Sequence, residues 1–531
     1  MTEPLNQTGT TIRTDRVVIV GAGLAALYAA LTLAPDPVVM ISPDVLGEGA
    51  SSAWAQGGVA AAMGDPDSPE SHTDDTLSAG AGTVDAAVAA QVTREARDHI
   101  LTLTRLGTPF DRDDQGGYVL SREAAHSYAR VVRVKGDQAG AEIMKALIAV
   151  VRETPSIQVL EGVMASDLHV KEGKVTGVWI ETSDPLDRAR PILLQGAATL
   201  LAGGGSGGLY KITTNPPRIR GQVIGMAARA GAVIADAEFV QFHPTAIDMG
   251  EDPAPLATEA LRGEGAVLRN NTGQRFMPEV HPDAELAPRD VVARAIYAQT
   301  QAGNRPVLDT RDALGAEILN HFPSVAEACA RAGIDPVQDT IPVAAAAHYH
   351  MGGISTDLKG RATLAGLWVC GEASSTGLHG ANRLASNGLL EALVYGRICA
   401  KGIAATLEEA QDTAEVTPHF QPGGVAPDPE AVEALRQTMT DHVGVVRDGK
   451  GLKTALRKIA QLEAQQDTCP AFLNMSATAT LIAAAALLRE ESRGAHCRLD
   501  FPAANGDRGK RSFLTWADAL DLRARIVSDP S

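Results

Sequence analysis

The stretch RVVIVGAGLAA, residues 16–26, decides the first part of the fold. Its β-branched run ends at Gly21, where the chain must turn tightly. Gly23 allows the backbone to approach a pyrophosphate, and Ala26 lets the next segment pack closely on the strand. We expect a strand, a turn and then a helix over about residues 24–33, whose positive N-terminus is directed at phosphates.

A second apolar strand is expected over residues 37–41, which completes the start of a βαβ unit. In dinucleotide-binding folds an Asp or Glu at the end of this strand holds the adenosine ribose. Here that acidic residue is missing and Ser42 stands in its place. An ordinary glycine-rich turn is the alternative interpretation, but the position between a strand and a helix favours nucleotide binding.

Length and hydrophobicity bound the architecture. A chain of 531 residues is too long for one core and predicts roughly two to four domains. Hydrophobic residues make up 45% of the chain, yet no uninterrupted apolar run approaches the length of a membrane helix, and residues 481–488 are expected to be a buried helix segment. The first fifteen residues are polar and resemble a disordered lead-in rather than a signal peptide, so a cytoplasmic location is expected.

Charge and cysteine usage restrict the partners. The net charge of −17 argues against nucleic acid and anionic membranes, and any anionic substrate must rely on local positive charge. The five cysteines are scattered without a C-x-x-C pair. They predict neither a disulfide framework nor a metal site, and they suit a reducing compartment.

Two further segments follow the strand-then-turn pattern. AATLLAGGGSGG, residues 197–208, places a glycine-rich turn after a strand, and GLWVCGE, residues 366–372, places Glu372 at the end of another. Ligands of open α/β sheets bind at the carboxyl ends of strands, so Glu372 is a candidate to hydrogen-bond hydroxyls of a cofactor. A helix-capping role for Glu372 is the alternative.

The chain divides into three predicted domains. We expect an α/β fold with a Rossmann-like nucleotide-binding domain, an inserted α+β capping domain and a C-terminal helical bundle. Residues 237–352 interrupt the βαβ rhythm, and beyond a Pro/Gly-rich linker the apolar residues recur at helical spacing. The predicted boundaries are 1–236 with 353–418, 237–352, and 425–531.

Four turn-prone segments carry the candidate binding chemistry. They are QFHPT (241–245), APRD (287–290), HYHMGG (348–353) and HGANRLAS (379–386). Together they supply His243, Arg289, His348 and Arg383, the side chains expected in a pocket that clamps a small anion with two carboxylates. For His348 a satisfied histidine in the core is the alternative, and the Gly-Gly turn that follows makes a ligand the preferred interpretation.

These segments, with GAGLAA (21–26), SSAWAQGG (51–58) and TEALRGEG (258–265), resemble the succinate dehydrogenase and fumarate reductase flavoprotein superfamily. Within it the resemblance is closest to the L-aspartate oxidase family and runs nearly end to end. It implies FAD as the cofactor and oxidation of L-aspartate to iminoaspartate, the first step of NAD biosynthesis through quinolinate.

The resemblance also implies roles for individual residues. The substrate-binding residues would be Glu123, Gln241, His243, Thr258, His348, Arg383 and Ser386. Proton transfer would involve Arg289 with Glu259 and Arg262. The FAD-binding residues would be Gly21, Ala22, Gly23, Leu24, Ala25, Ser42, Ser51, Ser52, Ala55, Gln56, Gly57, Gly58, Gln222, Glu372, Gly388 and Leu389.

Two residues separate this chain from its respiratory relatives. Where those relatives carry the histidine that is linked to the flavin, this chain has Ser51, so FAD is expected to be non-covalent. Glu123, in the segment LSREAAHS (120–127), matches a carboxylate that lies near the ammonium group of aspartate. Its alternative is a solvated loop glutamate. For Arg289, a substrate clamp is the alternative to proton transfer, and the two roles are compatible.

Two departures from the family pattern concern FAD affinity. Pro43 stands where a lysine often follows the serine, which removes a cation near the adenosine phosphates, and Gln222 stands where an aspartate is common.

Two other functions remain as alternatives. A soluble fumarate reductase or succinate dehydrogenase-like protein would share most of the site but lack Glu123, and an FAD-dependent tRNA-modifying scaffold would need a basic surface. Oxygen or fumarate is expected to reoxidise the flavin, and the unstable imine makes quinolinate synthase a candidate partner.

Overall fold

The computed structural model describes residues 10–529. The β-branched run of the fingerprint forms β2 (Val17–Val20), which is fully embedded in a parallel five-stranded sheet of order β18-β11-β2-β3-β7. The neighbouring strands are β3 (Val38–Ser42), β7 (Ile157–Glu161), β11 (Thr199–Leu201) and β18 (Leu367–Val369). Because both faces of the sheet are covered, the inner strands β2 and β3 are almost continuous apolar runs, whereas the edge strand β7 also contains polar residues.

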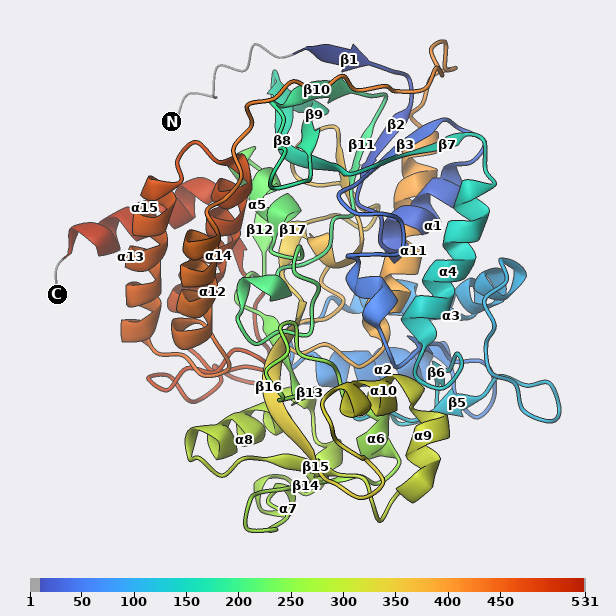
Figure 1. Cartoon of the computed structure of the whole chain (residues 1–531), viewed down its shortest axis with the longest axis vertical. Helices are drawn as coiled ribbons and strands as arrows, with labels where there is room; N and C mark the ends of the chain where they lie inside the picture. The colour runs from blue at the N-terminus through green and yellow to red at the C-terminus, as the bar shows by residue number, and fades with distance from the viewer. Residues whose placement is uncertain (1–9, 530–531) are drawn as a thin grey trace.

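The helix predicted after the fingerprint is α1 (Leu24–Leu33), with the bounds expected from the sequence. It packs against α11 (Asn387–Ala404), which returns to the sheet from a distant part of the chain. Figure 1 shows α1, α11 and α4 (Ala139–Arg152) together on one side of the molecule. The segment 197–208 contains β11, and its glycine-rich turn follows that strand beside the turn after β2, as predicted.

A second sheet of order β1-β10-β9-β8 lies over the first domain. It consists of β1 (Thr11–Arg13), β8 (Val163–Lys171), β9 (Lys174–Thr182) and β10 (Ile192–Gln195). The expected disordered lead-in is therefore wrong for residues 11–13, because their backbone pairs in parallel with β10. Residues 1–9 of that segment lie outside the described residues.

The segment predicted as an inserted domain builds a sheet of order β13-β16-β15-β14. Its strands are β13 (Val240–Ile247), β16 (Ile341–His350), β15 (Val307–Asp309) and β14 (Val267–Arg269). Helix α8 (Arg289–Gln301) packs on β13 and β16, and its apolar side joins a separate core cluster with residues such as Ile296 and Leu308. Figure 1 shows this green and yellow part below the nucleotide-binding sheet.

The last quarter of the chain is mainly helical, as predicted. It contains α12 (Pro429–His442), α13 (Gly449–Gln465), α14 (Pro470–Leu488) and α15 (Trp516–Ser528). Among the described helices α14 is the one long and apolar enough to cross a membrane, but 83% of its apolar window is buried inside the protein, as in a core helix. The strand β20 (Phe513–Leu514) leaves the bundle and pairs with β12 (Ile234–Ala235), so the helical part is joined to the first domain through a shared sheet.

The remaining elements are short or peripheral. They are η1 (Ser51–Trp54), β4 (Val59–Ala60), α2 (Pro69–Ala79), α3 (Ala86–Arg105), β5 (Leu120–Ser121), β6 (Val131–Val132), η2 (Gly207–Leu209), α5 (Gln222–Arg229), α6 (Ala260–Gly263), α7 (Met277–Val280), η3 (Ala284–Leu286), η4 (Gly315–Glu317), α9 (Ile318–His321), α10 (Pro323–Arg331), β17 (Gly353–Ser355), η5 (Gly371–Ala373) and β19 (Ser374–Ser375).

Candidate active site

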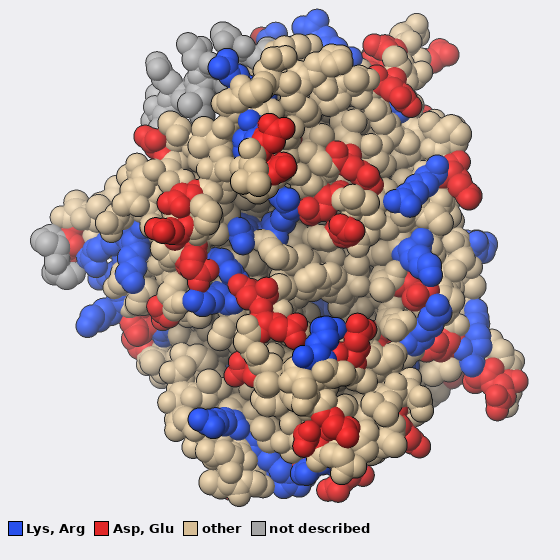
Figure 2. All heavy atoms as spheres, in the orientation of Figure 1, with Lys and Arg blue, Asp and Glu red and all other residues tan. Residues whose placement is uncertain are grey.

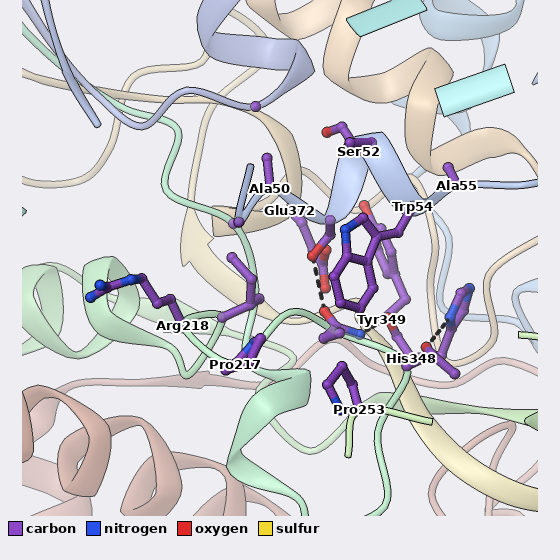
Figure 3. A pocket seen from close by; sticks show the side chains of 18 of the residues that line it. Ala50, Ser52, Trp54, Ala55, Pro217, Arg218, Pro253, His348, Tyr349 and Glu372 are labelled. Carbon is purple, nitrogen blue, oxygen red and sulfur yellow. Dashed lines mark hydrogen bonds between the residues drawn. The ribbon is translucent and has the colours of Figure 1, made fainter. Parts of the chain in front are cut away.

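A cavity of about 1330 Å³ runs between the nucleotide-binding sheet, the inserted segment and the helical bundle. Every residue that the sequence assigned to FAD lines it. Figure 3 shows Arg218 at one side of this cavity and His348 at the other, with Glu372 between them. The face in Figure 2 carries intermixed acidic and basic side chains without a basic patch over the opening.

The first end of the cavity is shaped by the fingerprint. Gly21 has a φ of +125°, and a Cβ there would lie 2.3 Å from the Ala202 carbonyl oxygen, so a glycine is required. Helix α1 begins after Gly23 without a side-chain cap. Its Leu24 amide donates to the Ser52 hydroxyl at 3.1 Å. The uncapped N-terminus therefore leaves donors for an anion such as a pyrophosphate.

Unsatisfied polar atoms in the wall fit a polar cofactor. The side-chain carbonyl oxygens of Gln56 and Gln222 are buried without a hydrogen-bond partner among the described residues, and both residues line the cavity. Glu372 accepts a hydrogen bond from the His350 amide at 2.8 Å with one oxygen, and burial raises its pKa to about 7. Buried donors and acceptors are normally paired, so these groups point to a ligand with hydrogen-bonding atoms, as FAD has.

The second end of the cavity brings together the four charged or imidazole side chains predicted from separate loops. His243 on β13 and His348 on β16 lie on neighbouring antiparallel strands, with ring centroids 5.1 Å apart. Arg289 is the first residue of α8, and Arg383 lies in the turn before α11. All four line the cavity. The clustering predicted from sequence is thus present in the structure.

Burial sets the charge of this cluster. It lowers the pKa of both His243 and His348 well below the ordinary value, with Arg289 and Arg383 adding to the effect. The imidazoles are therefore neutral near pH 7. Burial also lowers the pKa of Arg383, to about 10, so its guanidinium stays charged. The Nε of Arg383 has no partner among the described residues, which suits a carboxylate ligand.

A buried carboxylate holds two of the arginines. Glu259 is hydrogen-bonded by the Nε of Arg289 and lies 3.4 Å from the Nη2 of Arg262. Burial alone would raise the pKa of Glu259, but the two guanidiniums outweigh it and hold the pKa below its ordinary value. Arg262 does not line the cavity, so of the predicted trio only Arg289 and Glu259 reach the ligand space. The three side chains form a chain that leads inward from the cavity.

Glu123 belongs to the same cluster. Ser386 donates to its Oε2 at 3.0 Å, and both residues line the cavity. Burial, followed by the nearby Glu259 carboxylate, raises the pKa of Glu123 to about 7. The loop that carries Glu123 is tied to the catalytic cluster, because the Ala124 amide donates to Glu259 at 2.9 Å. A solvated loop position is excluded, since Glu123 is 3% exposed.

Of the predicted substrate residues Gln241 and Thr258, only Thr258 lines the cavity. Gln241 does not line the cavity: its amide donates to the Arg383 backbone carbonyl at 2.9 Å and accepts from Arg289 at 3.2 Å. These two hydrogen bonds hold both arginines in place. Thr258 lines the cavity, and its hydroxyl accepts from the Ala260 amide at 3.4 Å.

Sequence reasoning missed two supporting side chains. The ring of Tyr349 lies under Arg383, with the guanidinium carbon 4.5 Å from its centroid, and the Tyr349 hydroxyl donates to Glu391 at 3.1 Å. Thr214 is hydrogen-bonded to the Nδ1 of His348 at 2.8 Å. Tyr349 stands inside the HYHMGG segment, where alternation along a strand could have marked it. Nothing in the local sequence distinguishes Thr214.

Comparison with known proteins agrees with this geometry. A family model described as an FAD binding domain matches residues 16–389, and one described as the fumarate reductase flavoprotein C-terminal region matches residues 432–471 and 467–525. The L-aspartate oxidase of Caulobacter vibrioides is 52% identical over 94% of this chain and 95% of its own length. That of Bacillus subtilis is 37% identical over 92% of this chain and 91% of its own.

The chain belongs to the L-aspartate oxidase family. Its cofactor is FAD. Among solved structures, the FrdA subunit of E. coli quinol fumarate reductase superimposes with a TM-score of 0.84 at 28% identity, covering 95% of this chain and 94% of that one. Mycobacterium smegmatis Sdh1 gives a TM-score of 0.77 at 29% identity, with coverage of 95% and 94%. This member of the L-aspartate oxidase family therefore has the fold of the respiratory flavoproteins.

Proposed function

We propose that this protein oxidises L-aspartate to iminoaspartate with FAD, as the first step of NAD biosynthesis through quinolinate. Membership of the L-aspartate oxidase family supports the reaction. The observation that carries the substrate assignment is the buried Glu123 carboxylate, which shares one cavity wall with Arg289 and Arg383. A dicarboxylate without an amine leaves a buried carboxylate unpaired, whereas the ammonium group of aspartate pairs with it.

The charges around the cavity favour this assignment. The guanidiniums of Arg262, Arg289 and Arg383 exceed the Glu259 carboxylate by two positive charges. With Glu123 ionised the surplus falls to one, which balances aspartate with its two carboxylates and one ammonium. With Glu123 protonated the surplus of two balances a dicarboxylate such as fumarate. One titrating side chain thus adapts the site to either ligand.

In the proposed reaction the side chains mainly bind and orient. Bound FAD supplies the hydride acceptor for the carbon that bears nitrogen. Arg383 grips one carboxylate with its planar fork, and neutral His243 and His348 donate or accept hydrogen bonds without adding charge. Tyr349 beneath Arg383 keeps the guanidinium from rotating.

We assign Arg289 a proton-transfer role in the reduction of fumarate. Its Nε is hydrogen-bonded to Glu259, and Arg262 lies behind Glu259, so a proton given up by Arg289 is replaced along this chain of side chains. A guanidinium is a very weak acid and needs such a partner to donate a proton at neutral pH. In aspartate oxidation the same side chain serves to hold the substrate.

The remaining assignments belong to the same proposal. We expect fumarate or oxygen to reoxidise the flavin, a cytoplasmic location, and delivery of the unstable imine to quinolinate synthase. FAD is proposed to bind without a covalent link, because Ser51 lines the cavity where a histidine would be needed and its hydroxyl donates to Asn215 at 3.2 Å. Acid precipitation of the yellow holoenzyme should release all its flavin; flavin in the pellet would contradict this.

Anaerobic reduction of the flavin by L-aspartate and by succinate tests the proposal. The native protein should be reduced by aspartate much faster than by succinate, and Glu123→Gln should lose this preference. Glu251→Gln is the matched control, since Glu251 also lines the cavity but is paired with Arg331 away from the cluster. Equal rates with the two substrates in the native protein would identify it as a fumarate reductase-like flavoprotein instead.

A further inference from the structure

The end of β3 lacks the acidic residue that usually binds the adenosine ribose, because Ser42 stands there. The Ser42 hydroxyl is turned to its own loop, where it donates to the Asp44 backbone carbonyl at 2.5 Å. The turn thereby brings Asp44, two residues further along, into the cavity wall beside Ser42 and Pro43. A carboxylate is therefore present at this end of the cavity, although it lies outside the expected position.

Arg218 fixes the orientation of this carboxylate. Its Nε donates to the Oδ1 of Asp44 at 2.8 Å, and its Nη1 donates to the Ser183 carbonyl at 3.4 Å. The Ser183 hydroxyl in turn donates to the Pro43 carbonyl at 2.5 Å. Three separate segments thus meet at the end of β3. Arg218 also brings a cation to the same cavity that Pro43 lines, the position where the family often has a lysine.

The second oxygen of Asp44 is left for a ligand. No hydrogen bond to Oδ2 is present among residues 10–529, whereas Oδ1 is taken by Arg218. Gly49 makes room for Oδ2, since a Cβ at Gly49 would lie 2.2 Å from it. The side chains of Arg218 and Asp44 are 38% and 25% exposed, so the pair borders the cavity without being closed off from it.

We propose that Asp44, oriented by Arg218, binds the hydroxyls of the adenosine ribose of FAD in this chain. A carboxylate accepts hydrogen bonds from a pair of neighbouring hydroxyls, which is the chemistry found at the end of the second strand of dinucleotide-binding folds. Arg218 lies far from His348 across the cavity, so this is the end away from the substrate cluster. The inference rests on the FAD-dependent function proposed above.

Titration of the apoprotein with FAD, followed by quenching of flavin fluorescence, tests the inference without measuring turnover. Asp44→Asn keeps an acceptor for Arg218 but loses the charge, and it should weaken FAD binding by about tenfold or more. Arg218→Gln should weaken it by roughly three- to fivefold, since it only orients the carboxylate. Arg361→Gln is the control, because Arg361 forms an ion pair of similar length, 2.7 Å, with Asp357 at a place that does not line the cavity.

An FAD analogue whose adenosine ribose lacks both the 2′- and 3′-hydroxyls decides the role of Asp44. The native protein should bind this analogue about as weakly as Asp44→Asn binds FAD, and the variant should lose little more when given the analogue. If Asp44→Asn weakens the binding of FAD and of the analogue by the same factor, the carboxylate does not contact the ribose hydroxyls and the inference is wrong. If Asp44→Asn leaves FAD affinity unchanged, the inference is also wrong, and Asp44 and Arg218 form only a surface ion pair.

Two further measurements keep the outcomes distinct. Thermal unfolding of the apoprotein should be the same for the native chain and Asp44→Asn. If Asp44→Asn fails to fold, the affinities of the native protein and of Arg218→Gln for FAD and for the analogue still test the inference. Failure of the native protein to bind FAD at all would count against the proposed function rather than against Asp44.

Discussion

The two ends of the cavity are assembled in different ways. The nucleotide end is built around one continuous segment, β2, the glycine turn and α1, to which distant residues such as Arg218 and Gln222 are added. The substrate end takes its side chains from distant segments: Glu123 and Arg383 lie far apart in the sequence, and Arg289 is supplied by the inserted segment. The central turn of the nucleotide end is therefore specified locally, whereas the substrate cluster depends entirely on how distant segments are packed.

The largest effect is expected for Arg383→Leu, which tests whether the substrate end can be damaged without affecting the nucleotide end. Losing the guanidinium leaves a buried carboxylate of the substrate without its partner, at a cost on the order of 3–5 kcal/mol. The Michaelis constant for aspartate should rise by roughly 10²-fold or more, with FAD affinity nearly unchanged. Equal losses of both affinities would show that the two ends are not independent.

Arg289→Lys should have the next largest effect. Lysine keeps the charge but lacks the planar fork with which Arg289 donates from Nε to Glu259 and from Nη1 to Gln241. Turnover in fumarate reduction should fall by roughly 10²-fold, the scale of a lost general acid, while aspartate binding weakens moderately. Steady-state kinetics with both substrates measures this. Near-normal turnover with saturating fumarate would reduce Arg289 to a binding residue.

The pH dependence of aspartate binding should follow Glu123. In the empty site its pKa is raised to about 7, so it is protonated below that pH and has no charge to offer an ammonium group. Aspartate affinity should therefore fall by up to about tenfold per pH unit below pH 7, while fumarate affinity does not fall. Titrations between pH 5.5 and 8.5 measure the effect, and Glu123→Gln should remove it. A flat profile for the native protein would contradict this role.

The smallest effect tests one place where the two ends touch. Gly57 belongs to the flavin segment, yet a Cβ there would lie 2.6 Å from the Oε1 of Glu123. Because the end of a glutamate side chain can move, Gly57→Ala should displace the carboxylate without disrupting the fold. We expect the Michaelis constant for aspartate to rise by roughly three- to tenfold, with less change for fumarate. If Gly57→Ala keeps the native preference for aspartate over fumarate, the Glu123 carboxylate can move without losing its contact with the substrate.

The same contrast explains what the sequence could predict. The fingerprint yields β2 and α1 correctly because strand, turn and helix signals are local. The arginines and histidines of the four loops were identified by residue type, but the placement of Gln241 behind Arg289 depends on how β13 packs, which no local pattern reports. Asp44 was missed for a related reason, since the Ser42 turn shifts the carboxylate by two residues.

The sequence also did not predict the pairing of strands that lie far apart in the chain. The strand β1 is three residues long and stands in a polar segment, where its β-branched residues were too few to predict a strand, and it is ordered by pairing with β10. Likewise β20 is a two-residue strand whose partner, β12, lies almost three hundred residues earlier. Such strands are decided by tertiary contacts rather than by propensity.

The late return of α11 to the sheet has a consequence for synthesis on the ribosome. The strand β2 and helix α1 emerge first, but β18 (Leu367–Val369) and α11 (Asn387–Ala404), which complete the sheet and cover α1, follow after the whole inserted segment. While β13 to β16 are translated, the nucleotide-binding domain therefore remains incompletely folded, and the apolar surface that β18 and α11 later cover stays exposed. We expect a nascent chain that ends before residue 367 to be prone to aggregation and unable to retain flavin.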